Sequence, residues 1–168
     1  VPRLRSTFTS PSEESYGVMC PDTSLWMREM RSWPRDRFED LRVTLYRSTD
    51  IPWIMLEQRH SFHEMMSLIQ HAACVVTNDS GPAHIAQAMG RPTVVLFGPT
   101  SPEYLLVADN VVGVIGPEPC RGCRHVTWNR EMACAEPLCI KSISVEKVAE
   151  SVRCALGASA TDRGAARS

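Results

Sequence analysis

The segment from Asn78 to His84 combines residue types that can bind an anion at the start of a helix. Its proline is typical of a first helical turn, so the backbone amides of Ser80, Gly81 and Ala83 are expected to lack intrahelical partners. The positive end of the helix dipole favours an anion at this place, and Gly81 has no Cβ to keep a phosphate at a distance. The segment therefore predicts a site for a diphosphate.

Two side chains of the segment have other predicted roles. A phosphate would repel Asp79, so we expect this carboxylate to accept hydrogen bonds from the hydroxyl groups of an attached sugar. His84 lies in the first helical turn, where it can donate a hydrogen bond to phosphate or sugar and where the positive helix end favours the neutral imidazole. The alternative is that Asp79 or Ser80 only caps the helix, which is a common arrangement.

A second glycine turn, Gly98-Pro99-Thr100, follows the next predicted strand along the chain. The carboxyl ends of parallel strands meet at one edge of a sheet, so we expect this turn to open at the same edge as Asp79. An ordinary Gly-Pro turn without a ligand is the alternative interpretation.

Four of the seven cysteines lie in one loop and follow the spacing C-x2-C-x10-C-x4-C. They are Cys120, Cys123, Cys134 and Cys139. A C-x2-C pair followed by a second pair can complete tetrahedral thiolate ligation of zinc or iron. The C-x4-C half departs from the commonest zinc spacings, so free or occasionally oxidised thiols are the alternative. The other three are interpreted as small buried side chains, Cys20, Cys74 and Cys154.

The hydrophobic pattern around these motifs predicts strands that alternate with helices. Short runs rich in β-branched residues predict strands at 54–56, 74–77, 93–97 and 111–115. Helical spacing and capping residues predict helices that start at Trp33-Pro34, at the capping box Ser61 to Glu64, at Ala83 before Gly90, and at Ser144 with an end at Gly157. This alternation is typical of an α/β domain with a parallel, Rossmann-like sheet and right-handed crossovers.

The apolar pattern is confined to the middle of the chain. Residues 1–16 and 158–168 are polar and without periodicity, and we expect both segments to be disordered or frayed. Residues 17–157 are predicted to form one Rossmann-like domain with a cysteine-rich loop at 116–139. The chain starts at Val1 rather than at Met, as a piece of a longer protein would.

Composition argues against several classes of function. The 168 residues carry a formal net charge of −1, which offers no broad attraction for nucleic acid or for an anionic bilayer. No apolar run approaches the roughly 20 residues that span a bilayer, and no basic region followed by an apolar one marks a secretory signal. We therefore expect a cytoplasmic protein that does not bind nucleic acid.

Residues 78–100 read Asn-Asp-Ser-Gly-Pro-Ala-His-Ile-Ala-Gln-Ala-Met-Gly-Arg-Pro-Thr-Val-Val-Leu-Phe-Gly-Pro-Thr. This stretch resembles the signature of glycosyltransferase family 9, the ADP-heptose:lipopolysaccharide heptosyltransferases. Upstream, residues 31–38 resemble the Lys-x-Trp-Pro helix start of that family. The resemblance extends over roughly residues 18–156.

The resemblance implies roles for six residues in donor binding. Asp79 would contact the heptose, and Thr100 would lie at the rim of the site. Arg31 stands where the family usually carries a phosphate-binding lysine, so a positive charge is kept although its geometry changes. The residues that would line the diphosphate are Ser80, Gly81 and His84.

The resemblance also implies the GT-B fold, in which two Rossmann-like domains face each other, and this chain resembles only the C-terminal, donor-binding domain. Transfer would be inverting, would need no obligatory cofactor, and would belong to lipopolysaccharide core biosynthesis. The general base for the acceptor hydroxyl would lie in the N-terminal domain, so it stays open whether this chain alone is an enzyme.

The implied partners are ADP-heptose or a similar sugar nucleotide, a lipopolysaccharide core acceptor held through the other domain, and peripherally the inner face of the cytoplasmic membrane. Relatives carry a similar cysteine cluster, which is associated with iron in the branch that glycosylates autotransporters. The resemblance therefore implies a structural zinc or iron at the four cysteines.

A hypothesis of a different class makes the chain a non-catalytic assembly module that retains the fold and a four-cysteine metal finger. A nucleotide-dependent oxidoreductase is disfavoured, because the sequence has no Gly-x-Gly-x-x-Gly fingerprint.

Overall fold

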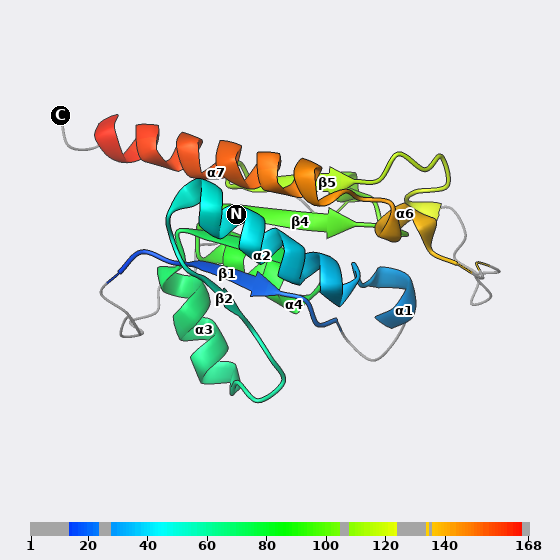
Figure 1. Cartoon of the computed structure of the whole chain (residues 1–168), viewed down its shortest axis with the longest axis horizontal. Helices are drawn as coiled ribbons and strands as arrows, with labels where there is room; N and C mark the ends of the chain where they lie inside the picture. Colours follow the sequence, from blue (N-terminus) through cyan, green and yellow to red (C-terminus); the bar gives the residue numbers. More distant parts are fainter. Residues whose placement is uncertain (1–13, 24–27, 105–107, 124–133, 135, 166–168) are drawn as a thin grey trace.

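The structure, a computed structural model, describes residues 14–23, 28–104, 108–123, 134 and 136–165, with side chains described as far as Gly157. Five parallel strands form one sheet in the order β2-β1-β3-β4-β5 (Figure 1). Their bounds are β1 Gly17–Cys20, β2 Trp53–Met55, β3 Cys74–Asn78, β4 Thr93–Phe97 and β5 Val111–Ile115. The α/β class and the parallel sheet predicted from the sequence are thereby confirmed.

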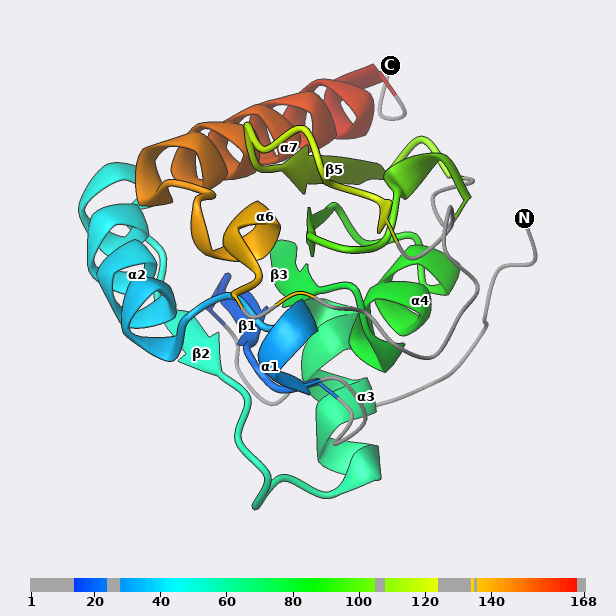
Figure 2. The same ribbon diagram turned by 90° about the vertical axis from the view of Figure 1, so that its right-hand side faces the viewer.

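Helices cover both faces of the sheet. On one face lie α2, Arg35–Thr49, and α7, Val145–Ala165, which pack against each other as well as on the strands. The other face carries α3, Phe62–His71, and α4, Gly81–Ala88 (Figure 2). Shorter elements at the carboxyl side of the strands are α1 Arg28–Arg31, the 3-10 turn η1 Pro102–Tyr104 and α6 Leu138–Lys141.

The side chains of the central strands alternate between two cores, because successive residues of a strand point to opposite faces. Met19 and Val76 join the core under α2 and α7, whereas Val18 and Val75 join the core under α3 and α4. All four are fully buried. The sheet is therefore apolar on both sides, as a parallel sheet with helices on both faces requires.

The helix starts follow their local signals closely. Ser61 and Glu64 form the predicted capping box of α3, in which the Ser61 hydroxyl accepts from the Glu64 amide and the Glu64 carboxylate accepts from the Ser61 amide. Ser144 accepts a hydrogen bond from the amide of Lys147 in the first turn of α7. Gly90 follows α4 with φ +68°, the left-handed conformation expected there.

Three boundaries differ from the sequence expectation. Tyr16 was expected in the frayed N-terminal segment, yet it is buried and its hydroxyl donates to the carbonyl of Leu68. β1 was not predicted at all, because it is only four residues long and follows a polar stretch. α7 does not end at Gly157 but continues to Ala165, since an alanine-rich sequence can carry glycines within a helix at a cost of about 1 kcal/mol each.

Two glycines give opposite stability predictions. A Cβ on Gly157 would meet nothing within 4 Å, so Gly157→Ala is expected to raise the free energy of unfolding by about 0.5–1 kcal/mol. A Cβ on Gly17 would lie 2.3 Å from the Trp53 ring, so Gly17→Ala is expected to lower it by about 1–3 kcal/mol. Urea denaturation of both variants would check this, and a shift of both in one direction would contradict it.

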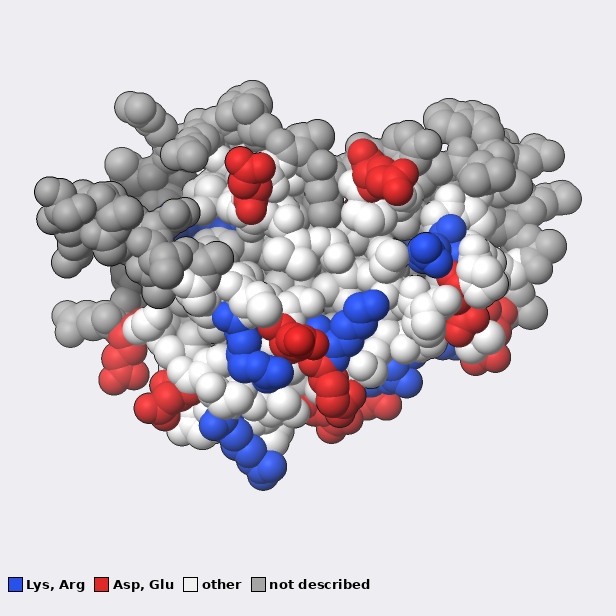
Figure 3. All heavy atoms as spheres, turned by 90° about the horizontal axis from the view of Figure 1, so that it is seen from above, with Lys and Arg blue, Asp and Glu red and all other residues white. Residues whose placement is uncertain are grey.

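The outer face formed by α2 and α7 carries basic and acidic side chains of both signs, interspersed over the described atoms (Figure 3). Part of this mixture is ion-paired, as between Arg42 and Glu39 at 2.9 Å. No broad field of one sign therefore develops on the face shown. Among the described residues, no helix has the length and apolarity needed to cross a bilayer.

Candidate functional site

The predicted site residues lie where the strand order of the sheet reverses. From β1 the chain crosses to β2 on one side and then returns to β3 on the other, so β1 and β3 flank a topological switch point. Ligands of open parallel sheets bind beyond the carboxyl ends of the strands at such a point. Asp79 directly follows β3, Thr100 follows β4, and Arg31 ends α1 after β1.

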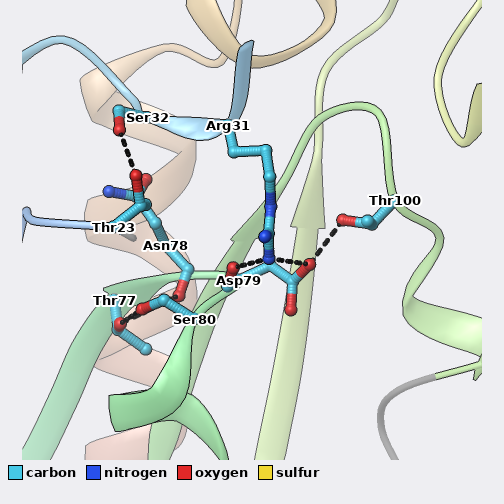
Figure 4. A network of polar contacts seen from close by, with 8 residues as sticks. All are labelled: Thr23, Arg31, Ser32, Thr77, Asn78, Asp79, Ser80 and Thr100. Atoms are coloured by element: carbon cyan, nitrogen blue, oxygen red, sulfur yellow. Dashed lines mark hydrogen bonds and ion pairs between the residues drawn. The ribbon is translucent and has the colours of Figure 1, made fainter. Parts of the chain in front are cut away.

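Asp79 is the centre of a polar network at this edge (Figure 4). Its carboxylate oxygen Oδ2 accepts from the Nη2 atom of Arg31 at 3.0 Å and from the hydroxyl of Thr100 at 2.7 Å. The same Nη2 atom also donates to the backbone carbonyl of Asp79. The Asp79 side chain is buried, so these two donors replace the water that a buried carboxylate needs.

The start of α4 has no side-chain cap, but the expectation that the Ala83 amide is free was wrong, because this amide donates to the Ser80 carbonyl at 3.0 Å. Ser80 occupies the N-cap position, but its side chain makes no capping hydrogen bond and instead donates to the carbonyl of Asn78 at 3.2 Å. The alternative that Asp79 or Ser80 merely caps this helix is therefore not what the structure shows. A Cβ on Gly81 would meet no described atom within 4 Å apart from its own helix backbone and its chain neighbours, so there is room beside this residue.

The six predicted donor-binding residues are thus gathered in one region. Arg31 and Thr100 contact Asp79 directly, and Ser80 and Gly81 follow it in the chain. His84 lies one turn into α4 with its side chain exposed, and it is not joined to the network by any hydrogen bond between described residues. The arrangement presents helix amides, one guanidinium and one carboxylate to a ligand.

Asn78 has a structural role that the sequence analysis did not assign. Its amide nitrogen donates to the carbonyl of Pro21 at 2.7 Å, and its carbonyl oxygen accepts from the amide of Trp33 at 2.9 Å. These bonds tie the end of β3 to the chain that leaves β1 and to the start of α2. A buried Asn at the end of a strand was the available signal, but its partners are 57 and 45 residues away.

The second glycine turn packs closely on α6. A Cβ on Gly98 would lie 2.8 Å from the Cβ of Ile140 and 3.3 Å from the Cys139 sulfur. The carbonyl of Gly98 also accepts from the amide of Gly122 at 3.0 Å. Gly98 therefore serves close packing, and Thr100 is the residue of this turn that faces the network.

Cys139 of the predicted finger is affected electrostatically by the other three cysteines. Burial, together with the smaller effects of Cys120, Cys123 and Cys134, raises the pKa of Cys139 to about 11. Cys139 is therefore a neutral thiol at neutral pH. Within the described part of the chain, no three or more His, Cys, Asp or Glu side chains are arranged to hold a metal ion, so the metal site stays a prediction.

The remaining cysteines divide into two groups. Cys20 and Cys74 are buried, as expected, and burial raises the pKa of Cys74 to about 12 and that of Cys20 further. The expectation for Cys154 was wrong, because its side chain is exposed. The inward stripe of α7 passes through Val148 and Val152, and a residue two positions after Val152 lies on the outer face.

Comparison with known proteins supports the resemblance read from residues 78–100. Residues 52–133 match the profile of glycosyltransferase family 9 (heptosyltransferase). Lipooligosaccharide heptosyltransferase 2 of Haemophilus influenzae is 41% identical over 66 residues, which are 39% of this chain and 19% of that protein. Lipopolysaccharide heptosyltransferase 2 of Escherichia coli is 52% identical over 40 residues, 23% of this chain and 12% of that protein.

Solved structures share the fold. ADP-heptose LPS heptosyltransferase II of E. coli superposes with a TM-score of 0.66 at 19% identity, covering 86% of this chain and 47% of that one. The dodecameric iron-containing heptosyltransferase TibC, solved in complex with ADP-D-β-D-heptose, gives 0.70 at 15% identity, covering 91% and 48%. This chain therefore spans about half the length of these proteins. Residues 52–133 thus match glycosyltransferase family 9, the heptosyltransferase family, and the chain has the Rossmann-like α/β fold of a GT-B half.

Proposed function

We propose that this chain is the donor-binding part of an inverting heptosyltransferase and that it binds a sugar nucleotide of the ADP-heptose type. The observation that carries the proposal is the open, uncapped start of α4 beside Arg31 and Asp79. A helix start without a side-chain cap and with an adjacent guanidinium is suited to a diphosphate, and a carboxylate next to it is suited to sugar hydroxyls. Support also comes from relatives whose names and complexes specify ADP-heptose.

Arg31 has a second feature that fits a ligand with acceptor oxygens. Its Nη2 atom donates to Asp79, whereas its Nε atom is buried and has no hydrogen-bond partner among the described residues. Buried donors are nearly always satisfied in folded proteins, so a phosphate oxygen or a bound water would complete this guanidinium. In that arrangement Arg31 joins the diphosphate side of the site to Asp79 on the sugar side.

The chemistry proposed for these residues is stabilisation of the leaving group. As the sugar departs, negative charge grows on the diphosphate, and fixed donors at the helix start and on Arg31 stabilise that charge. Ser80 and Gly81 would supply the backbone amides, and His84 would donate from the first turn of α4. The general base for the acceptor hydroxyl is proposed to come from the other half of the protein.

The wider setting of the proposal follows the family. The acceptor would be a lipopolysaccharide core sugar held through the other domain, and the reaction would take place in the cytoplasm at the inner face of the membrane. No obligatory cofactor is proposed for the transfer. The folded unit, which includes Tyr16 and extends through α7 to Ala165, and a cysteine-rich loop at 116–139 belong to the same proposal.

Titration calorimetry of the chain with ADP and with ADP-heptose tests the proposal. We expect heat of binding with both ligands and a loss of at least tenfold in affinity for Gly81→Asp, which places a carboxylate in the open space at the helix start. Gly81→Ala is the matched control and is expected to bind within a few-fold of the unmodified chain. Folded protein that gives no heat with either nucleotide would contradict the proposal.

The second candidate function is an assembly module with a four-cysteine metal finger. The electrostatic effect of Cys120, Cys123 and Cys134 on Cys139 supports it, because such an effect acts over short distances. Metal analysis and a sizing measurement would separate the two functions. A stoichiometric metal and a stable oligomer without affinity for nucleotide would favour the module.

A further inference from the structure

The contact of Thr100 with Asp79 makes the two oxygens of the carboxylate different in their hydrogen bonding. The Thr100 hydroxyl donates to Oδ2 at 2.7 Å, and Arg31 donates to the same oxygen at 3.0 Å. Oδ1 accepts no hydrogen bond from any residue that the structure describes, and Figure 4 shows it pointing away from both donors. One oxygen is therefore held in place while the other is left for a ligand.

The burial of the pair shows that this hydrogen bond belongs to the interior of the site. Thr100 is 5% exposed and Asp79 is 4% exposed. A hydroxyl that is almost completely buried and already donating to a carboxylate is poorly placed to bind a charged diphosphate. Its effect on a ligand would pass through Asp79, whose carboxylate plane is fixed when one oxygen is held by two donors.

The position of Thr100 is set by packing of the loop that carries it. Gly98, two residues before it, lies against Ile140 of α6 and accepts a hydrogen bond from Gly122. A Cβ on Gly122 would lie 3.4 Å from the Cβ of Ser101, the residue after Thr100. Contacts on both sides therefore fix the hydroxyl in its place above β4.

We propose that Thr100 is a positioning residue for recognition of the donor sugar. It holds Oδ2 of Asp79 so that Oδ1 is aimed at a hydroxyl group of the sugar, and it does not touch the diphosphate. The inference rests on the proposed function, since it assigns a part of the same site. It differs from that proposal in predicting that Thr100 affects the sugar and not the nucleotide.

Calorimetry with two ligands tests this assignment. Thr100→Val keeps the shape and removes the hydroxyl, and it is expected to weaken ADP-heptose binding about fivefold to tenfold while ADP binding stays within about twofold. Thr100→Ser retains the donor and is expected to restore ADP-heptose binding to within about twofold. Thermal melts of each variant verify that the protein is folded.

A double-mutant cycle shows whether Thr100 acts through Asp79. Asp79→Ala is expected to weaken ADP-heptose binding, and adding Thr100→Val to it is expected to cause no further loss. Equal weakening of ADP and ADP-heptose by Thr100→Val, additive losses in the cycle, or no change with either ligand would overturn the inference. If the unmodified chain binds neither nucleotide, the proposed function itself fails, and that result is distinct from these three.

Discussion

Replacing Arg31 with Met is expected to lower the free energy of unfolding by about 3 kcal/mol and to abolish measurable ADP binding. Arg31 supplies the only ionic partner of Asp79 among the described residues, and the Asp79 side chain is 5% exposed. Without the guanidinium, a nearly buried carboxylate keeps only the Thr100 hydroxyl as a donor. The cost comes from the uncompensated charge and exceeds the value of the pair itself. Chemical denaturation and calorimetry measure the two effects.

Three further variants separate charge from packing at this position. Arg31→Lys keeps the charge but lacks the forked guanidinium donors. Its stability and ADP affinity are expected to lie between those of the unmodified chain and Arg31→Met. Arg31→Met combined with Asp79→Asn removes the orphaned charge and is expected to recover much of the lost stability. Arg42→Met breaks an exposed pair with Glu39 and should cost less than about 1 kcal/mol. Equal losses for Arg31→Met and Arg42→Met would refute the argument.

Asn78→Asp is expected to destabilise the fold by about 3 kcal/mol at neutral pH, although the two side chains have the same shape. The new carboxylate can still accept from the Trp33 amide, but its second oxygen would face the Pro21 carbonyl where the Asn78 amide now donates. Asn78 is fully buried, so water can reach neither the second oxygen of the new carboxylate nor the Pro21 carbonyl oxygen that repels it.

The loss caused by Asn78→Asp is expected to shrink as the pH falls. Burial and the facing carbonyl raise the pKa of the introduced carboxyl in the folded state, and the protonated form can again donate to Pro21. Relative to the unmodified chain, stability is therefore lowest at high pH and recovers as the pH falls through the raised pKa. Denaturation curves at pH 5 and pH 8 check the sign.

Asn110→Asp is the matched control for this pH effect. Asn110 also donates through its amide nitrogen to a carbonyl at 2.7 Å, that of Arg91, but in a partly exposed place. Water can solvate the new carboxylate there, so a smaller loss with little dependence on pH is expected. A pH-independent loss at Asn78→Asp would show that geometry rather than charge causes the destabilisation.

Much of the fold could be predicted because its signals are local. The Ser61 capping box, the buried stripe of α2 at Phe38, Leu41 and Leu45, and the left-handed Gly90 each depend on residues within about one or two helical turns. The strands β3, β4 and β5 are short β-branched runs between turn residues, and each was found within one residue of its bounds. The turn that follows β3 could be recognised from residues 78–84 alone.

What the sequence did not reveal depends on contacts between distant segments. β1 contains four residues and pairs on both sides with strands that come later in the chain, so its place in the sheet is decided by β2 and β3 rather than by its own pattern. The exposure of Cys154 was likewise decided by which stripe of α7 packs inward. Local sequence carries no information on such partners until the chain is folded.

The amino-acid sequence by itself determined that a helix with an open glycine start follows a buried strand, because backbone amides at a helix start and a missing Cβ are properties of a few adjacent residues. Only the tertiary structure decided that Arg31 and Thr100 share one oxygen of Asp79, across 48 and 21 residues of chain. Packing of the loops at the edge of the sheet brings these residues together. As a result, one oxygen of the Asp79 carboxylate is held by two donors and the other accepts from no described residue.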